Sequence, residues 1–334
     1  MKQYKIATLG SHSALQILKG AKDEGFETIC VCEKGRSKPY ESFRVADRII
    51  MLDSFKDFPK VAKQLKDDNA IIIPHGTFVD ALGGGVLEKL DMNYFGNRSI
   101  LKWEADRKMQ REWLAEAGLP LPKIFGKPED IDCPAIIKFY GARGGRGFFL
   151  AKSAEEFYRK MEEHHGTKYI IQEYIVGAPI YIHYFYSVVN DEVEVMSFDK
   201  RYESNVDSIG RIAAKDQLDM GLETSYNITG NVPLVVRESL LPKIFEMGEA
   251  VVKAARKIEK NGIFGPFSLE TVITPELKFY VFEISARIVA GTNPYMMGSP
   301  YTALRYNEPM STGRRIAREI KEAIAKNMLD KVLL

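Results

Sequence analysis

The sequence predicts an α/β module with a small parallel sheet, followed by a larger α+β region. Strand-like and helix-like segments alternate over residues 1–95, as they do in β-α-β units. Residues 120–175 instead combine two strands around a glycine-rich turn with a helix and a further strand. Runs of strands and long helices over 180–334 favour an α+β domain. The expected division is 1–98 and 99–334, with a small subdomain at about 120–178.

Hydrophobic spacing defines the individual elements. Short apolar runs indicate strands, whereas residues 13–24 place Leu15 and Leu18 on one helical face. The expected strands are Tyr4–Leu9, Thr28–Cys32, Arg48–Leu52, Ala70–Ile73, Ala135–Phe139, Phe148–Ala151, Tyr169–Ile175, Ile180–Val189, Glu194–Phe198, Phe267–Ile273 and Phe279–Ile284. The expected helices are 13–24, 59–66, 99–117, 153–163, 239–260 and 312–327. Residues 200–235, rich in Asn, Asp, Gly and Ser, are expected to form a long functional loop.

The bulk composition restricts the classes of function. Lys and Arg total 47 against 45 for Asp and Glu, a net charge of +2, which gives no reason to expect a nucleic-acid or membrane partner. No apolar run approaches the roughly 20 residues that span a bilayer, and the N-terminus lacks the apolar stretch of a signal peptide. Three cysteines without a CxxC pair argue against a disulfide framework or a zinc site. We therefore expect a cytoplasmic globular protein.

A glycine-rich turn follows the strand that ends near Lys138. Residues 141–147, Gly-Ala-Arg-Gly-Gly-Arg-Gly, combine four glycines with two arginines. Glycines allow backbone N–H groups to approach an anion closely, and arginines offer forked donors to phosphate oxygens. The pattern is not a Walker A loop, because no Lys-Ser or Lys-Thr follows the second glycine. Taken alone, the turn is interpreted more simply as a flexible hairpin with solvated arginines.

Two glutamates are expected to face each other across a β-hairpin. A loop centred on Glu276-Leu277 places Glu270 opposite Glu283. Directly opposed residues have Cβ atoms about 5 Å apart, where two negative charges repel unless a cation lies between them. Mg²⁺ with nucleotide phosphates is the usual hard cation. Alternation along the strand also brings Arg287 within reach of a phosphate beside the metal. The alternative is a solvated hairpin in which one glutamate points outward.

The order of these parts resembles the ATP-grasp superfamily over residues 100–290. That superfamily has a lysine on the helix before the lid, a second lysine on a lid strand, a glycine-rich loop, a hinge strand and an acidic hairpin. The resemblance implies a Rossmann-like parallel sheet followed by an ATP-grasp fold with a small lid subdomain. It also implies ATP and Mg²⁺ as cofactors, with Mn²⁺ as the alternative ion. The implied ATP-binding residues are Lys108, Lys138, Gly141, Arg143, Gly144, Gly145, Arg146, Gly147, Gln172, Glu173, Tyr174 and Ile175. The implied metal ligands are Glu270 and Glu283, and the implied catalytic cations are Arg287 and Lys138.

Two departures from the superfamily pattern bear on the site. The usual Glu-x-Asn is Glu283-Ile284-Ser285 here, so that a serine replaces an asparagine contact to metal or phosphate. The glutamate that commonly follows the hinge glycine is missing from Gly177-Ala178-Pro179-Ile180. Its ribose-binding role is assigned to Glu203.

A closer resemblance, to the PurP family, runs almost the full length. It is carried by Ser11-His12-Ser13-Ala14-Leu15-Gln16, Pro74-His75-Gly76-Thr77-Phe78, Thr229-Gly230-Asn231 and the run from Ile284 to Asn293. That family comprises archaeal, formate-dependent synthetases of 5-formaminoimidazole-4-carboxamide ribonucleotide (FAICAR). The resemblance implies that ATP and formate formylate the amine of aminoimidazole carboxamide ribotide (AICAR), with ADP and phosphate as further products, in purine (IMP) biosynthesis.

The PurP resemblance implies that His12, Thr77 and Asn231 contact the ribotide. Ser13 is expected to cap the first helix, where a phosphate can bind. Without the resemblance, His12 is better interpreted as a loop histidine that is hydrogen-bonded to the backbone.

The implied chemistry is phosphoryl transfer followed by acyl transfer. Attack of formate on the γ-phosphate would give formyl phosphate, which the ribotide amine then attacks. Lys138, Arg287 and the metal would neutralise charge on the transferred phosphoryl group, and residues 141–147 would form a moving lid that excludes water.

Three other interpretations stay open: an ATP-grasp ligase of other specificity, a nucleotide sensor without chemistry, and a nucleic-acid-binding module. A homo-oligomer is expected for a metabolic enzyme of this size.

Overall fold

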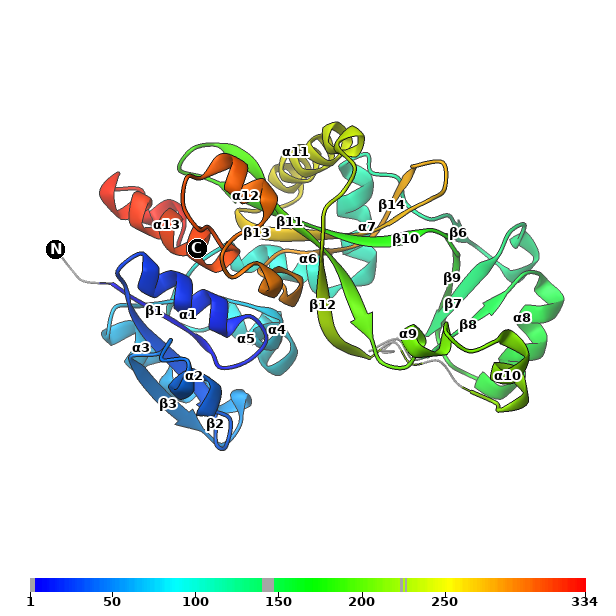
Figure 1. Cartoon of the computed structure of the whole chain (residues 1–334), viewed down its shortest axis with the longest axis horizontal. Helices are drawn as coiled ribbons and strands as arrows, with labels where there is room; N and C mark the ends of the chain where they lie inside the picture. Colours follow the sequence, from blue (N-terminus) through cyan, green and yellow to red (C-terminus); the bar gives the residue numbers. More distant parts are fainter. Residues whose placement is uncertain (1–3, 140–146, 223–224, 226) are drawn as a thin grey trace.

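The computed structural model describes residues 4–139, 147–222, 225 and 227–334, and these residues form three β-sheets (Figure 1). A parallel sheet lies at one end of the molecule, an antiparallel sheet occupies the middle, and a small four-stranded sheet lies at the other end. Within the described residues, no helix is long and apolar enough to cross a bilayer.

The N-terminal sheet is parallel, as the alternation of strands and helices predicts. Its strand order is β3-β2-β1-β4-β5. The strands are β1 (Lys5–Leu9), β2 (Glu27–Glu33), β3 (Arg48–Leu52), β4 (Ala70–Ile72) and β5 (Asn93–Tyr94), and the helices are α1 (Ala14–Asp23), α2 (Lys38–Ser42), α3 (Pro59–Asp67), α4 (Gly76–Leu82) and α5 (Gly84–Leu87). Ligands of such sheets bind beyond the carboxyl ends of the strands, which here means the loops after β1 and β4.

The small sheet has an apolar core of its own, as the predicted hairpin-helix-strand unit requires. Its strand order is β6-β9-β7-β8, and α8 packs on β8. The elements are β6 (Ile124–Phe125), β7 (Ala135–Phe139), β8 (Phe148–Ala151), α8 (Ala154–Met161) and β9 (Tyr169–Glu173). Ser153 caps α8, because its Oγ accepts a hydrogen bond from the N–H of Glu156. The core includes Phe125, Ile137, Phe139, Phe157 and Ile171.

The central sheet is antiparallel, with the strand order β12-β11-β10-β13-β14. Its strands are β10 (Ala178–Ser187), β11 (Glu192–Glu203), β12 (Ile228–Leu234), β13 (Gly265–Ile273) and β14 (Phe279–Ser285), and the long helices beside it are α11 (Leu241–Ile258) and α13 (Thr312–Ala325). One face packs on α11, where Tyr184 donates a hydrogen bond to the carbonyl of Ile244 at 2.8 Å. The other face, called the α13 face, carries the side chains of Tyr181, His183, Phe185 and Ser187 on β10.

The α13 face is covered at one end and open at the other. Ser187 donates a hydrogen bond to Glu319 of α13, and the guanidinium of Arg315 lies 4.4 Å from the ring centre of Phe185. The 3₁₀ helix η6 (Ala290–Tyr295) then approaches the sheet at His183, and α12 (Pro300–Arg305) follows it in the chain. Polar side chains gather on the same face beyond this cover.

Two predicted elements are wrong. Residues 200–235 are not one long loop, because β11 continues to Glu203, and α9 (Val206–Ile209), α10 (Ala214–Asp219) and β12 follow. Their polar residues alternate on paired strands, which a composition-based prediction cannot distinguish from a loop. Residues 99–117 form two helices, α6 (Leu101–Ala105) and α7 (Arg107–Glu116), separated at Asp106. The Asp106 carboxylate begins α7 as its N-cap, accepting from the N–H groups of Lys108 and Met109.

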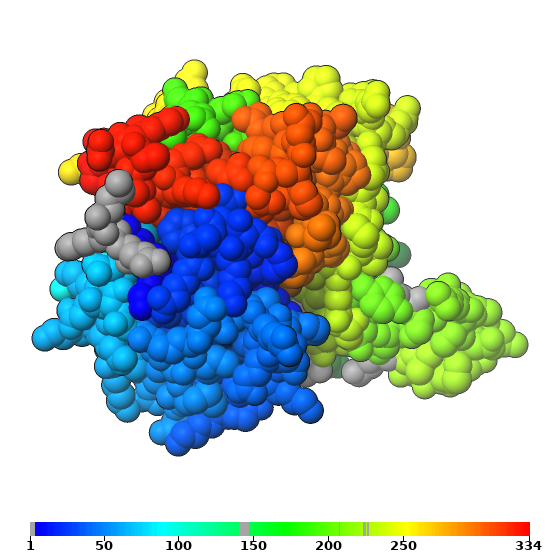
Figure 2. Space-filling view, turned by 60° about the vertical axis from the view of Figure 1, so that its left-hand side comes forward, coloured from blue at the N-terminus to red at the C-terminus, as the bar shows by residue number. Residues whose placement is uncertain are grey.

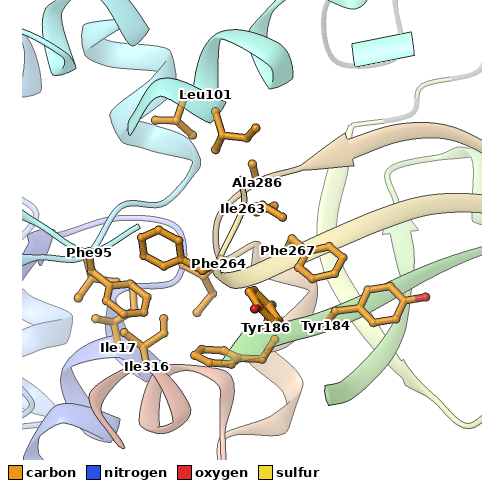
Figure 3. Packing of buried hydrophobic residues seen from close by; sticks show 14 of the residues in the cluster. Ile17, Phe95, Leu101, Tyr184, Tyr186, Ile263, Phe264, Phe267, Ala286 and Ile316 are labelled. Atoms are coloured by element: carbon orange, nitrogen blue, oxygen red, sulfur yellow. The ribbon is translucent and has the colours of Figure 1, made fainter. Parts of the chain in front are cut away.

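The N-terminal sheet and the central sheet share one apolar core. Figure 3 shows Ile17 of α1, Phe95, Ile316 of α13 and Phe264 and Phe267 near β13 converging on one region. In Figure 2 the N-terminal part, coloured blue, lies directly against the C-terminal helix in red. The domain boundary at residue 98 therefore remains a prediction.

Helices α1 and α13 approach so closely that a glycine is required at their crossing. A Cβ at Gly313 would overlap the carbonyl of Gln16. The side chain of Gln16 reaches Gly313 as well, accepting a hydrogen bond from its N–H at 3.2 Å. The contact holds the loop that follows β1 next to the C-terminal third of the chain.

Glu24 anchors this interface, and its replacement by glutamine should destabilise the protein. Burial alone would raise the pKa of Glu24, but hydrogen bonds from Arg318 and Arg314 of α13 outweigh that effect and lower the pKa to about 2. Because this folded-state pKa lies below the ordinary value of 4.5, the stabilisation is present above pH 4.5 and is lost as the pH falls towards 2. We expect Glu24→Gln to lose about 3 kcal/mol of unfolding free energy at pH 7 and less at pH 3, measured by urea unfolding.

The control is Glu27→Gln, which removes a partly exposed ion pair with Lys5. Its expected cost is below about 1 kcal/mol. Equal losses in the two variants, or a loss for Glu24→Gln that does not change between pH 7 and pH 3, would contradict the anchoring role.

Candidate active site

Strand pairing brings a row of polar side chains together on the α13 face. Asp199 of β11 pairs with Tyr181 of β10, Tyr181 pairs with Glu270 of β13, and Glu270 pairs with Glu283 of β14. Directly paired residues of an antiparallel sheet point to the same face. The row therefore crosses four strands at the open end of this face.

The predicted opposition of Glu270 and Glu283 is confirmed, but a β-bulge is needed to achieve it. The turn is centred on Glu276, since Ile273 pairs with Phe279, and a regular ladder would place Phe282 opposite Glu270. The register shifts between Glu270 and Thr271, which brings Glu283 into place. Bulges re-aim side chains in this way next to functional sites.

The two glutamates differ in environment. Glu270 is buried, whereas Glu283 is exposed. Burial, together with the negative charge of Glu283, raises the pKa of Glu270 to about 8, although the charge of Arg201 opposes this shift. The arrangement is one that a bound cation would relieve.

Arg201, which sequence reasoning missed, is the nearest cation to this pair among the described residues. Its guanidinium forms an ion pair with Glu270 and lies 4.2 Å from the ring centre of Tyr181. In the strand register, Arg201 of β11 lies directly opposite Asn231 of β12, so the two side chains share the α13 face. The only available signal was its position two residues after Asp199, which would have required β11 to continue past Phe198.

Lys138 reaches the acidic pair from the small sheet. It is on β7, and its Nζ donates to Gln172 Oε1 on β9 at 3.4 Å. Burial, together with the charge of Arg107, lowers the pKa of Lys138, although the charges of Glu283 and Glu270 oppose this shift. The structure therefore brings three of the predicted residues, Lys138, Glu270 and Glu283, to one place.

Lys108 is not brought to this place. Its side chain is 87% exposed on α7 and lies 3.8 Å from Glu112, one helical turn away. The preceding residue, Arg107, is the α7 cation that acts on Lys138. The structure therefore places Lys108 away from Glu270 and Glu283, and its role in ATP binding stays a prediction.

The other residues predicted to bind the nucleotide lie on several elements, and some of them are not described. Residues 141–146 of the glycine-rich loop, with Gly141, Arg143, Gly144, Gly145 and Arg146, lie outside the described residues, and Gly147 accepts a hydrogen bond from the N–H of Phe139. On β9 and just after it, Glu173 accepts from the N–H of Lys123, Tyr174 is exposed, and Ile175 is half-buried. Glu203 ends β11, and its charge acts on Tyr181.

His12 and His75 form a stacked pair at the carboxyl edge of the N-terminal sheet. Their ring planes are parallel, with centroids 5.4 Å apart. His75 is fully buried, and its Nδ1 accepts a hydrogen bond from the N–H of Thr77. The proton is therefore on Nε2, which donates to the carbonyl oxygen of Leu9. His12 keeps contact with solvent, but partial desolvation and the charges of His75 and Arg287 lower its pKa. Both rings are therefore uncharged at neutral pH.

Ser13 does not cap α1 in the predicted way. It occupies the N-cap position, but its Oγ bonds His12 Nδ1 at 2.8 Å instead of a backbone N–H. Ser13 is buried, so its hydroxyl fixes the orientation of the His12 ring. Together, His12, Ser13 and Thr77 line the ends of β1 and β4.

Arg287 links the two halves of the site. Its guanidinium is paired with Glu104 of α6 at 3.0 Å, and the two side chains are 15% and 9% exposed. Its positive charge lowers the pKa of Glu270 on one side and of His12 on the other. Glu104 had no sequence signal, because it lies far from the hairpin in the chain and meets it only through α6 packing.

A divalent cation at the acidic pair would require ligands from outside the protein. Among the described residues, no group of three or more His, Cys, Asp or Glu side chains is arranged to hold a metal. Two carboxylates suit Mg²⁺, which usually binds one or two of them and completes its shell with waters and substrate phosphates. The pair Glu270 and Glu283 fits an ion of this kind, delivered with a nucleotide.

The chain matches two family models and curated relatives over most of its length. Residues 6–125 match a family model described as "Protein of unknown function (DUF1246)", and residues 150–334 match one described as "Domain of unknown function (DUF1297)". A 5-formaminoimidazole-4-carboxamide-1-(beta)-D-ribofuranosyl 5'-monophosphate synthetase from Pyrococcus abyssi is 53% identical over 338 residues, 98% of each chain.

Solved structures show the same fold. A crystal structure of an IMP biosynthesis protein PurP from Thermococcus kodakaraensis has a TM-score of 0.81 and 31% identity, covering 98% of this chain and 100% of that one. An ADP complex of an N5-carboxyaminoimidazole ribonucleotide synthetase has a TM-score of 0.68 at 15% identity, covering 96% and 77%. The predicted ATP-grasp fold is confirmed.

Proposed function

The chain belongs to the family of 5-formaminoimidazole-4-carboxamide-1-(beta)-D-ribofuranosyl 5'-monophosphate synthetases, and from this premise we propose that it formylates the amine of AICAR with formate and ATP. The products are FAICAR, ADP and phosphate. The proposal rests on the position of Arg287, whose charge lowers the pKa of Glu270 in the acidic pair and of His12 in the loop after β1. A nucleotide on one side and a ribotide on the other would meet at this residue.

The nucleotide phosphates are assigned to the space between β7 and the hairpin of β13 and β14. Glu270 and Glu283 would hold Mg²⁺, or Mn²⁺ in its place, which supplies charge neutralisation to the triphosphate and the transferred phosphoryl group. Lys138 adds a positive charge from the small sheet, and Arg201 would be free to contact an anion if its partner Glu270 held a metal.

Formate is a poor electrophile, so it must be activated before an amine can attack. Attack of a formate oxygen on the γ-phosphate gives formyl phosphate and releases ADP. Attack of the ribotide amine on the formyl carbon then releases phosphate, which takes up the amine proton. Arg287 is suited to stabilise the charge that develops on the transferred group, because Glu104 holds its guanidinium in place. No nucleophilic side chain is needed.

The ribotide is assigned to the loops after β1 and β4 and to Asn231. His12, as an uncharged imidazole, can donate or accept a hydrogen bond without adding charge. Ser13 bonds the His12 ring, and the Thr77 N–H donates to His75, on which His12 is stacked. The N–H groups at the start of α1 suit a phosphate. A cytoplasmic location and a homo-oligomeric assembly remain predictions.

The test is a turnover assay with the purified full-length chain. We expect FAICAR and ADP to form together from ATP, formate and AICAR, and no ADP when amino acids replace formate. With [¹⁸O]formate, the released phosphate should carry ¹⁸O, because the formyl phosphate route transfers a formate oxygen to phosphorus. ADP release with other acids at an equal rate, or phosphate without the label, would contradict the proposal.

A further inference from the structure

A chain of buried polar groups runs from the candidate ribotide contact Asn231 into the central sheet. Asn231 Nδ2 donates to Asp199 Oδ2 at 2.7 Å, Asp199 Oδ1 lies 2.8 Å from His183 Nε2, and His183 Nδ1 lies 2.7 Å from Ser268 Oγ. Asp199 and His183 are each 1% exposed, and Ser268 is 4% exposed. The four groups come from β12, β11, β10 and β13 and share the α13 face.

The carboxylate of Asp199 determines which way the Asn231 amide is turned. An ionised carboxylate can only accept hydrogen bonds, so the NH₂ end of Asn231 must face it. The carbonyl oxygen of Asn231 is then directed away from Asp199. His183 occupies the second oxygen of Asp199 through Nε2–H, which leaves this carboxylate with a fixed orientation.

The 3₁₀ helix η6 covers Asp199 and His183 and prevents other orientations of the Asp199 side chain. Gly291 of η6 lies so close that a Cβ there would overlap Asp199 Oδ1 and would lie 2.8 Å from His183 Cε1. Asp199 therefore cannot turn towards η6 without displacing it. Only the Asn231 end of the chain is partly exposed, at the open end of the α13 face.

We propose that Asp199, held by His183, is a positioning residue that presents the Asn231 carbonyl oxygen to an N–H group of the ribotide. The chemical class of its partner is thereby specified: an exocyclic amine or carboxamide N–H can donate to this oxygen, whereas an ionised phosphate cannot. The inference rests on the proposed function, in which Asn231 contacts the ribotide. In this arrangement Asn231 binds the aminoimidazole carboxamide end of the substrate. The phosphate of the substrate then binds at the start of α1.

A reciprocal exchange of the two side chains tests the proposal. In Asp199→Asn the new amide can donate, so Asn231 turns over and offers NH₂ to the substrate. We expect the KM for AICAR to rise about tenfold to a hundredfold while the KM for ATP stays unchanged. Asn231→Asp sets two carboxylates against each other and should be impaired similarly. In the double variant, the amide introduced at position 199 can donate to the carboxylate introduced at position 231. That carboxylate again offers an outward acceptor, and the KM for AICAR should recover.

The control is Ser197→Ala, on the same strand and face, because the Ser197 hydroxyl is buried and has no hydrogen-bond partner among the described residues. It should leave both KM values unchanged. If Asp199→Asn fails to fold, His183→Leu and His183→Gln replace it, and only the glutamine variant, which retains a donor, should keep the wild-type KM for AICAR.

An unchanged KM for AICAR in Asp199→Asn, additive losses in the double variant, or equal effects of the two His183 variants would overturn the positioning role. Each of these outcomes presupposes that the wild-type protein forms FAICAR. Absence of that activity in the wild type would instead reject the proposed function itself.

Discussion

Replacing Glu270 by alanine is expected to abolish ADP formation while ribotide binding survives. The substitution removes the buried carboxylate of the pair that would hold the metal, and it leaves Arg201 without its partner. We expect kcat to fall about 10³-fold or more, because charge on the transferred phosphoryl group is no longer neutralised. His12 and Thr77 belong to other elements, so calorimetric binding of AICAR should change little.

Two further variants separate charge from structure in this prediction. Glu270→Gln keeps a side chain that can accept a hydrogen bond from Arg201 but loses the charge, and it should be as inactive as the alanine variant. Glu276→Ala, in the exposed turn of the same hairpin, should retain wild-type turnover. Unchanged turnover in Glu270→Ala would remove the metal assignment.

The second large effect is expected at Arg287, where stability and activity should respond differently to the same pair of substitutions. Arg287→Met leaves the Glu104 carboxylate buried without a cation, and burial already raises the pKa of Glu104. We expect a loss of about 3–5 kcal/mol in unfolding free energy together with loss of turnover. Glu104→Gln/Arg287→Met removes both charges and should regain most of the stability but none of the activity.

The measurements are urea unfolding and FAICAR formation for the wild type, both single variants and the double variant, analysed as a double-mutant cycle. Recovery of turnover together with stability in the double variant would mean that Arg287 is only a structural partner of Glu104. That outcome would also reject the proposal that the nucleotide and the ribotide meet at Arg287.

Short apolar runs that alternate with helix-like segments predicted the parallel N-terminal sheet, and the hairpin-helix-strand pattern predicted the small sheet. The opposition of Glu270 and Glu283 was also predicted, although the structure achieves it through a bulge beside Glu270. A bulge leaves no clear signal in the local sequence, so the register was correct although the expected turn centre was not.

Three residues that we place in the site could not be identified from the sequence, for two physical reasons. Asp199 and Arg201 belong to a strand that was expected to end at Phe198, because the polar residues after it resemble a loop. His183 received no role, since its partners lie on neighbouring strands and not nearby in the chain. Cross-strand contacts between distant segments can be recognised only when the pairing register is known.

The structure also separates Lys108 from the paired glutamates, although the superfamily pattern assigns it to ATP binding. The helix containing it begins at Asp106, and this phase turns Lys108 to solvent and Arg107 towards Lys138. A one-residue change in helical phase rotates a side chain by about 100°. Roles carried over from a motif therefore depend on where the helix begins.

The most direct test of the central claim is anomalous diffraction from a crystal grown with Mn²⁺ and a non-hydrolysable ATP analogue. The account predicts a manganese peak between Glu270 and Glu283, at about 2.1 Å from a carboxylate oxygen of each, with the γ-phosphate in the same coordination shell. Manganese bound elsewhere, with neither glutamate as a ligand, would contradict the proposed site.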